Sequence, residues 1–376
     1  NYENKISQFR NKGKYGKAMR YAELVLQVRR SAGQPDDWWE VAHARLKAQT
    51  IKTIAGLPVA DREALAAADR ADDEVARAFV EQRYSDAEHL LRDQIAARDC
   101  LLVEENVDLA RSMWILARVL SRSRNDACES ERLYCGSLMI LRRLFPNGHP
   151  DEADILTNLG ILQERCDLAV AEQLLRHALA ADLRLVPSHY TRFARVANAL
   201  AVILDKRGSL DLAERLCREA LSTCRSHLKG DDDDVAQLVN TLGHVLQLGG
   251  NLNEAESLYR ESLGYFCRLH SGDHAGKARL LNILANILQA RGQSPAAEAL
   301  YREVLAMRRR LSSGDNIEVA GSLHNLATIL YDRGDLIAAE ENHKEALEMQ
   351  QRLFPGDHPD LARSFDGLAK VLEAHG

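Results

Sequence analysis

Seven cysteines and thirteen histidines are the side chains of this sequence best suited to nucleophilic or metal chemistry. The cysteines extend from Cys100 to Cys267, are odd in number and show no CxxC spacing. A structural zinc site needs four converging cysteine or histidine ligands, and the sequence contains no such cluster. We interpret the cysteines as small buried thiols in a reducing compartment, and we predict no metal site and no cofactor.

Motifs that support catalysis are also missing from the sequence. It contains no GxGxxG or P-loop for phosphates, no HExxH for zinc and no GxSxG nucleophile elbow. Histidines such as His244 and His324 lie in different segments, with no nucleophile or carboxylate beside them. We therefore predict no catalytic residue and no enzymatic activity for the chain itself; a Cys/His pair assembled from distant segments is the remaining alternative.

The composition is that of a folded protein with a large core. Of the 376 residues, 46% are hydrophobic, 28% are charged and 5% are aromatic, and the few aromatics disfavour a β-sandwich or propeller. No apolar run reaches the roughly 18 residues that span a bilayer, and the N-terminal residues lack the apolar core of a signal peptide. Because the net charge is −6, we expect no nucleic-acid or membrane partner and a cytoplasmic location.

A nine-residue motif, approximately AExLxxxAL, recurs along the chain. Five copies are spaced 42 residues apart, two earlier copies follow steps of 43 and 41, and a degenerate copy lies near Ala18. Self-similarity at such a period is typical of solenoids, in which each repeat is one supersecondary unit. The motif glutamates are Glu88, Glu131, Glu172, Glu214, Glu256, Glu298 and Glu340.

Glycine and alanine recur with the same period and indicate helix pairs. A glycine five residues before each motif alanine suits a left-handed residue that ends one helix before the next begins. A second glycine is followed each time by aspartate, which can accept hydrogen bonds from the free N–H groups of the next helix. The motif alanines are expected where two helices approach closely. These series are Gly208, Gly250, Gly292 and Gly334; Asp231, Asp273, Asp315 and Asp357; and Ala213, Ala255, Ala297 and Ala339.

The pattern LxNLAxxLxxxG, then AExLYxxAL and GDHP, resembles the tetratricopeptide repeat, and its 42-residue length is similar to the kinesin-light-chain subclass found also in bacterial arrays. The resemblance implies an all-α fold, a right-handed superhelical solenoid of antiparallel helix pairs in which each repeat touches only its neighbours. We expect an irregular helical region with a degenerate first repeat at 1–83, a regular array of 41–43-residue repeats at 84–357, and a capping or truncated helix at 358–376. Two joints depart from the pattern, at Cys166, where glycine is missing, and at 186–190.

The region before residue 84 contains two further amphipathic segments. Residues 36–58 predict a helix with an aspartate cap and a Gly–Pro stop, and residues 60–82 predict a second helix. All three tryptophans, Trp38, Trp39 and Trp114, fall in the first third of the chain. We interpret them as a local core, with a partner-binding hot spot as the alternative.

The resemblance implies that the first helix of each pair lines a concave, partner-binding surface. Polar side chains recur there in rows 42 residues apart, and a ladder of amides can hold an extended peptide by its backbone. The alternative is that these rows are only the solvated side of amphipathic helices. The predicted partner-binding residues are Arg195, Asn198, Gln237, Asn240, His244, Arg279, Asn282, Asn286, His324, Tyr331, Arg363 and Asp366.

Together these expectations predict a non-catalytic scaffold or sensor arm that binds a partner protein or peptide in a concave groove. We expect it to be part of a larger protein or complex. The alternative is a regulatory domain of a bacterial effector enzyme, such as a caspase-like protease, a kinase or a nucleotide-binding switch, whose catalytic part lies elsewhere. The partner, the oligomeric state and the choice between the concave face, the convex face and the tryptophan-bearing region are left open by the sequence.

Overall fold

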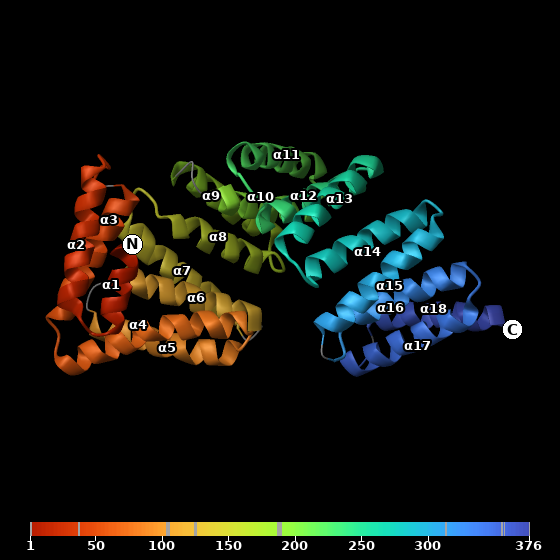
Figure 1. Cartoon of the computed structure of the whole chain (residues 1–376), viewed down its shortest axis with the longest axis horizontal. Helices are drawn as coiled ribbons and strands as arrows, with labels where there is room; N and C mark the ends of the chain where they lie inside the picture. The colour runs from red at the N-terminus through yellow and green to blue at the C-terminus, as the bar shows by residue number, and fades with distance from the viewer. Residues whose placement is uncertain are drawn as a thin grey trace. The chain divides into compact units, whose positions relative to one another are not determined.

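The computed structural model describes residues 2–36, 38–102, 106–123, 126–185, 190–312, 314–354, 356 and 358–375. These residues form eighteen α-helices and contain no strand (Figure 1). None of the helices described has a stretch apolar and long enough to cross a bilayer. The helices divide into two compact units, Asn1–Arg207 (unit 1) and Gly208–Gly376 (unit 2).

Unit 1 contains the first ten helices. From α4 onward they pack as consecutive antiparallel pairs, α4 with α5, α6 with α7 and α8 with α9. Their bounds are α1 (Tyr2–Asn11), α2 (Tyr15–Ser31), α3 (Trp39–Ala55), α4 (Val59–Val80), α5 (Tyr84–Leu101), α6 (Val107–Ser123), α7 (Ala127–Leu144), α8 (Pro150–Gln163), α9 (Leu168–Leu185) and α10 (Tyr190–Lys206).

Unit 2 contains the other eight helices, and each packs on the next in chain order. This is the solenoid architecture that the 42-residue period predicts. The bounds are α11 (Leu210–His227), α12 (Asp233–Leu248), α13 (Leu252–Leu269), α14 (Ala275–Ala290), α15 (Ser294–Leu311), α16 (Ile317–Asp332), α17 (Leu336–Leu353) and α18 (Pro359–His375).

At four of the turns between paired helices the predicted glycine is left-handed. Gly208, Gly250, Gly292 and Gly334 all have φ between 73° and 83°. At Gly250 the next residue closes the turn, because the Asn251 N–H donates to Leu246 O at 2.8 Å. Residue 82 occupies the same position before α5, and there Gln82 adopts φ 60°, a conformation that strains a side chain with a Cβ.

The connection between successive pairs corrects one prediction. The helix caps are Asp232, His274 and Asn316, each one residue later than the predicted aspartate. The predicted residues bind an arginine of the following repeat instead, through two hydrogen bonds of 2.5–2.9 Å. These ion pairs are Asp231 with Arg268, Asp273 with Arg310 and Asp315 with Arg352, and the predicted Asp357 lies outside the described residues.

Alanine and glutamate of the motif hold each pair together. The alanines 213, 255, 297 and 339 have no exposed surface, which confirms that helices approach closely there. Six of the seven motif glutamates pair with the base four residues later, as in Glu298 with Arg302, whereas Glu131 has Cys135 at that position. Three of the glutamates also bind an arginine just before the turn, as Glu256 does with Arg291. The motif pair therefore connects one helix pair to the next, which simple helix support would not require.

The N-terminal region departs from this arrangement. Helix α1 contacts α4 and helix α3 contacts α6, so these repeats do not touch only their chain neighbours. The predicted aspartate cap of α3 is wrong for the described residues, because Trp38 is the N-cap and its side chain forms no capping hydrogen bond, while Asp36 pairs with Arg30. Asp37 lies outside the described residues. The Gly–Pro stop is confirmed, since α3 ends at Gly56.

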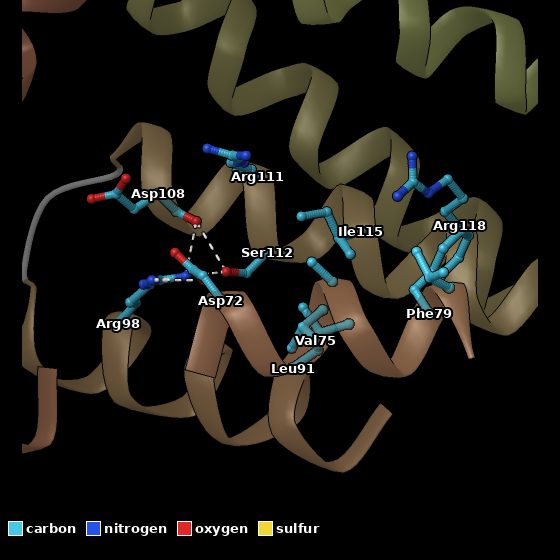
Figure 2. A pocket seen from close by; sticks show the side chains of 12 residues that line it. Asp72, Val75, Phe79, Leu91, Arg98, Asp108, Arg111, Ser112, Ile115 and Arg118 are labelled. Atoms are coloured by element: carbon cyan, nitrogen blue, oxygen red, sulfur yellow. Dashed lines mark hydrogen bonds and ion pairs between the residues drawn. The ribbon is translucent and has the colours of Figure 1, made fainter. Parts of the chain in front are cut away.

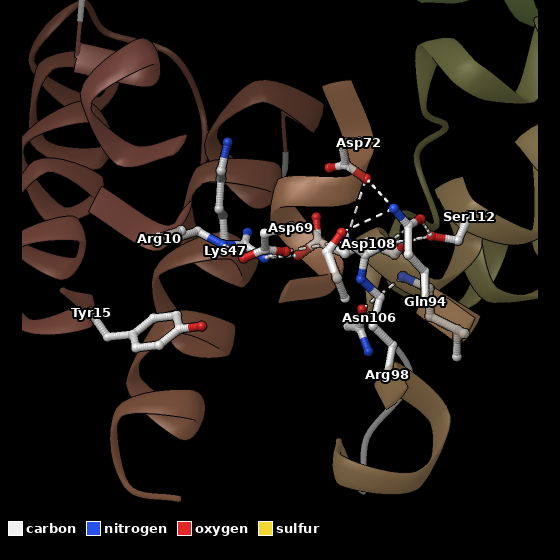
Figure 3. A network of polar contacts seen from close by, with 12 residues as sticks. Arg10, Tyr15, Lys47, Asp69, Asp72, Gln94, Arg98, Asn106, Asp108 and Ser112 are labelled. Carbon is white, nitrogen blue, oxygen red and sulfur yellow. Dashed lines mark hydrogen bonds and ion pairs between the residues drawn. The ribbon is translucent and has the colours of Figure 1, made fainter. Parts of the chain in front are cut away.

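Buried charges attach α1 to the first repeats (Figure 3). The Arg10 guanidinium donates to Asp69 at 2.8 and 2.9 Å and to Asp108 at 2.8 Å. Arg98 donates to Asp69 at 3.1 Å from the other side. Side chains of Arg10 and Asp69 are only 8% and 7% exposed, so this part of the core is held by fully desolvated ion pairs.

Tryptophan and cysteine side chains complete the comparison with the sequence. The three tryptophans are half-buried; Trp39 packs edge-on against His149, and Trp114 packs against the apolar cluster of α6, α7 and α8. The prediction of buried thiols is wrong for five of the seven cysteines, because only Cys217 and Cys224 are buried. The other five lie on solvated helix faces and at the Cys166 turn.

Candidate partner-binding surface

All twelve predicted partner-binding residues lie on first helices of the pairs, and all are exposed or half-buried. Arg195 and Asn198 belong to α10 in unit 1 and are described apart from the rest. In unit 2, helices α12, α14, α16 and α18 present the other ten residues. The solvated position of these side chains agrees with the prediction, but position alone does not distinguish a binding surface from a merely wet one.

Part of the predicted amide ladder is engaged within unit 2. The Asn325 amide donates to Asn282 Oδ1 at 2.9 Å, which joins α16 to α14. The Tyr301 hydroxyl lies 2.5 Å from Asn286 Oδ1 and 2.9 Å from Gln289 Oε1. The sequence reasoning missed Asn325 and Tyr301. The tyrosine belongs to the AExLY motif, so the 42-residue period could have indicated that its hydroxyl reaches this face.

Other groups of the same face keep hydrogen-bonding capacity. Asn240 Oδ1 is buried and has no hydrogen-bond partner. Arg279 is exposed and forms no ion pair with any residue that the structure describes, and the neighbouring Gln237 is exposed as well. A buried acceptor without a partner costs free energy. Helices α12 and α14 therefore carry the groups best placed to bind a partner.

Toward the C-terminus the predicted residues have local partners. Arg363 pairs with Asp360 at 3.2 Å, and Asp366 pairs with Lys370 at 2.6 Å. Tyr331 is half-buried against the apolar cluster of α14 to α18. These contacts support the alternative, a solvated helix face, for this end of the row.

His324 lies against a second histidine. Its ring centroid is 5.1 Å from that of His343, and the rings meet edge to face. Burial, with the charges of His343 and Arg363 nearby, lowers the pKa of His324 to about 4. A neutral imidazole at this position is not a strong anion site.

In unit 1 the predicted Arg195 pairs with Asp154 at 3.2 Å. A shared hydrogen bond aligns α6 with α12: the Ser137 hydroxyl donates to Ala110 O at 2.6 Å, and the Ser262 hydroxyl donates to Ala236 O at 2.7 Å. This alignment places Arg111 of α6 at the position of Gln237, which is in the same row as Arg195. By the same register Arg118 of α6 lies in the row of His244. The sequence reasoning missed these arginines, because the α6 repeat lacks the LxNLA pattern and its register depends on two steps other than 42.

Two hollows lie on this face of unit 1, one on each side of Arg118. The first, of about 280 Å³, lies between α4 and α6; apolar side chains such as Val75, Phe79 and Ile115 line part of it, and charged side chains such as Asp72 and Arg111 line the rest (Figure 2). The second, of about 530 Å³, is lined by α6, α7 and α8 and includes Arg118, Arg122 and Arg165. We call them the apolar hollow and the arginine hollow.

Among the described residues no three His, Cys, Asp or Glu side chains converge as metal ligands. The buried thiols of Cys217 and Cys224 are weak nucleophiles, because burial raises their pKa to about 12 and about 11. What the surface offers is hydrogen-bonding and cationic groups on rigid helices.

Family models agree with this architecture. A model described as tetratricopeptide repeat matches residues 192–267 and 234–310, and a second one with that description matches residues 319–360. These segments are tetratricopeptide repeats. The resemblance inferred from the sequence is thereby confirmed for this part of the chain.

Solved structures with the same fold include three informative cases. BtubC (BKLC) from P. vanneervenii is 23% identical, with 65% of this chain and 94% of that one covered and a TM-score of 0.50. A Rap protein complexed with Competence and Sporulation Factor is 13% identical, with 99% and 97% covered and a TM-score of 0.51. A signal transduction ATPase with numerous domains, with a tetratricopeptide repeat sensor, from Pyrococcus horikoshii is 15% identical, with 91% and 50% covered and a TM-score of 0.55.

At these identities the likeness shows the fold alone. A search of curated protein sequences finds no match. The tetratricopeptide repeats support a protein-interaction scaffold as the general role of the chain.

Proposed function

We propose that this chain is a non-catalytic module that binds a segment of a partner protein, or a peptide, on the first helices of its tetratricopeptide repeats. The observation that carries the proposal lies on the successive first helices α12 and α14, where Gln237, Asn240 and Arg279 keep free hydrogen-bonding or charged groups. The Rap protein of similar fold was crystallised with Competence and Sporulation Factor, which supports ligand binding by such an array.

Amides suit the binding of an extended segment. Each asparagine carries one acceptor oxygen and two N–H donors, so it can satisfy both polar groups of a peptide backbone. Arg279, exposed and without an ion pair among the described residues, would bind a carboxylate of the same segment. Because these groups stand on helices packed in register, little entropy is lost in ordering them on binding.

A second candidate is a sensor arm of a larger effector protein, acting in the cytoplasm. It is favoured by the ATPase of similar fold, in which a tetratricopeptide repeat sensor is one part of a longer chain. In both candidates the chain itself binds and does not catalyse. They differ in what binding controls.

The test is a selection of random peptides, displayed on phage, against the full chain. Selected peptides are synthesised, and their Kd values are measured for the parent and for the variants Asn240→Ala and Arg279→Ala. We expect each variant to weaken binding about tenfold or more, which corresponds to roughly 1.4 kcal/mol. The matched control is Arg215→Ala, an arginine on α11 whose side chain is 70% exposed.

Equal affinities for the parent, Asn240→Ala and Arg279→Ala would contradict this assignment. Loss of affinity in Arg215→Ala to the same extent would also contradict it, because the effect would then be one of overall charge. Melting temperatures of all variants should match that of the parent.

A further inference from the structure

The arginine hollow of unit 1 has no counter-charge among the residues described. Arg118, Arg122 and Arg165 line it, and none of its other described lining residues is acidic. The three arginines form no ion pair or hydrogen bond through their guanidinium groups with the residues that the structure describes. Arg122 and Arg165 are exposed, so their charges are available to a ligand.

Arg118 is the member of this group that most needs an acceptor. Its Nε atom is buried and has no hydrogen-bond partner. Its guanidinium lies 4.4 Å from the centroid of the Phe79 ring, and the Arg122 guanidinium lies 5.3 Å from that same ring. Two cations therefore share one aromatic ring, which attracts both but neutralises neither.

The acid of α8 that acts on Arg118, Asp154, does not supply the missing charge. Burial lowers the pKa of Arg118 and the charge of Arg122 lowers it further, so the pKa is lowered on balance although Tyr134 and Asp154 raise it. Asp154 already pairs with Arg195 and approaches Arg192. A half-buried cation without an anion is less stable than a paired one, so the hollow is better suited to an anionic ligand than to water alone.

We propose that the arginine hollow binds a phosphate group carried by a segment of the partner, an inference that rests on the proposed function. Three guanidinium groups around one hollow match the charge of a phosphate, about −1.5 to −2 at neutral pH, better than that of one carboxylate. Arginine also matches the oxygen geometry of phosphate through paired N–H donors. The Asn158 amide, which lines the same hollow and uses one N–H on Asp154 O, has a second N–H to donate.

The apolar hollow lies on the opposite side of Arg118 and accepts a neighbouring side chain of the same segment. Its volume of about 280 Å³ suits one large aliphatic or aromatic group, for which Val75, Phe79 and Leu91 supply the apolar part of the wall; Asp72, Arg98, Asp108 and Arg111 line the other part (Figure 2). Val80, whose side chain is 81% exposed, extends the apolar rim. A partner with a phosphorylated residue next to a large apolar residue would occupy both hollows.

The experiment uses the full chain and three fluorescein-labelled pools of heptapeptides, randomised except for a central phosphoserine, serine or glutamate. Binding is measured by fluorescence anisotropy at fixed ionic strength. We expect the phosphoserine pool to bind at least tenfold more tightly than the serine pool, with the glutamate pool between them. The double variant Arg122→Gln/Arg165→Gln, which alters only exposed side chains, should remove most of that difference, and adding Arg118→Gln should remove the rest.

The matched control is Arg20→Gln/Arg132→Gln, two exposed arginines of unit 1 outside both hollows. We expect this control to change the preference for phosphoserine less than twofold. Equal binding of the phosphoserine and serine pools would overturn the proposal, as would equal losses in the control and in the hollow variants. A glutamate pool that binds as tightly as the phosphoserine pool would overturn the choice of phosphate in favour of an acidic segment.

Failure here is distinguishable from failure of the proposed function. Peptides selected without phosphate depend on Asn240 and Arg279 if the proposed function holds, and their affinities do not involve the arginine hollow. If those peptides bind and the phosphoserine pool shows no preference, the proposed function stands and this inference is wrong.

Discussion

The N-terminal part of unit 1 and the regular repeats of unit 2 both use arginine–aspartate ion pairs to join successive helices. The pairs are buried in unit 1 and exposed in unit 2. In unit 2, exposed arginines bind the aspartate of the linker, as Arg268 binds Asp231. In unit 1, Arg10 reaches from α1 to Asp69 of α4 and Asp108 of α6 inside the core. Exposed pairs contribute little to stability, whereas breaking a buried pair leaves an uncompensated charge.

This difference shows where the chain is regular and where it is specific. The exposed pairs recur in three repeats, so each can be lost with little effect. The buried network occurs once in the described residues and fixes α1 on α4, α5 and α6 (Figure 3). Because all three tryptophans belong to unit 1, tryptophan fluorescence reports on unit 1.

The largest expected effect is that of Arg10→Ala. Removing this guanidinium leaves Asp69 without its closest cation inside the core and should destabilise unit 1 by about 3–5 kcal/mol. Urea unfolding followed by tryptophan fluorescence measures it. The matched control, Arg268→Ala, removes an exposed pair and should cost at most about 1 kcal/mol by circular dichroism. Similar losses in both variants would contradict the comparison.

The next effect concerns acid. Burial, with the charge of the other ring for His43, lowers the pKa of both His43 and His149 to about 4. Both bases therefore bind protons less readily in the folded chain than in the unfolded one, where the pKa is about 6.5. Their contribution to stability is complete above pH 6.5 and is lost as the pH falls toward 4.

The measurement is the urea midpoint of tryptophan fluorescence at pH 7.0 and pH 5.0. His43 Nδ1 lies 3.2 Å from His149 Nε2, and His149 Nδ1 accepts the Asp151 N–H, so a proton on His43 Nδ1 removes the acceptor of the contact between α3 and the start of α8, and a proton on His149 Nδ1 removes the acceptor of the helix cap. We expect a lower midpoint at pH 5.0 and a smaller decrease in His43→Leu. An unchanged midpoint in the parent would show that the two histidines do not titrate as their burial requires.

A smaller effect tests close packing in the regular repeats. Ala297 of α15 has no exposed surface, so the larger side chain of Ala297→Leu should lower the free energy of unfolding by about 1–3 kcal/mol. The control is the neighbouring Ala296→Leu, whose side chain is exposed on the same helix. Chemical denaturation followed by circular dichroism should leave the control within about 0.5 kcal/mol of the parent. If both variants lose the same stability, Ala297 is not a close-packing site.

The smallest expected effect is a gain. Gln82 adopts φ 60° in the turn position that glycine occupies in unit 2, so Gln82→Gly should stabilise unit 1 by roughly 1 kcal/mol. The control Gln293→Gly changes a residue with φ −86°, where glycine relieves no strain and only loosens the unfolded chain. A loss of stability in Gln82→Gly, measured by tryptophan fluorescence, would contradict the claim that the Gln82 backbone is strained.

Much of the fold could be predicted from the sequence, because repetition shows which residues share a role. The glycine turns, the close-packed alanines and the Glu–Arg pairs of the motif were all predicted from their 42-residue period and are confirmed. The sequence could not show that Asp232 rather than Asp231 caps α12. Two adjacent aspartates can each cap a helix, and only the position of Arg268, which binds Asp231, decides between them.

The N-terminal contacts could not be predicted for a related reason. Arg10 and Asp108 are separated by 98 residues, and no period connects them. For the candidate site, the sequence indicated which helix faces are solvated. It could not show that Asn282 and Asn286 are already engaged while Asn240 is not, because those bonds depend on side chains from neighbouring repeats.

The central claim, that a partner binds on the first helices, is tested most directly by photo-crosslinking. A display-selected peptide carrying a diazirine group is irradiated with the full chain, and the labelled residues are identified by mass spectrometry. The proposed function predicts adducts in α12 and α14, near Asn240 and Arg279, that disappear when unlabelled peptide competes. Adducts confined to the second helices α13 and α15, under the same competition, would contradict it.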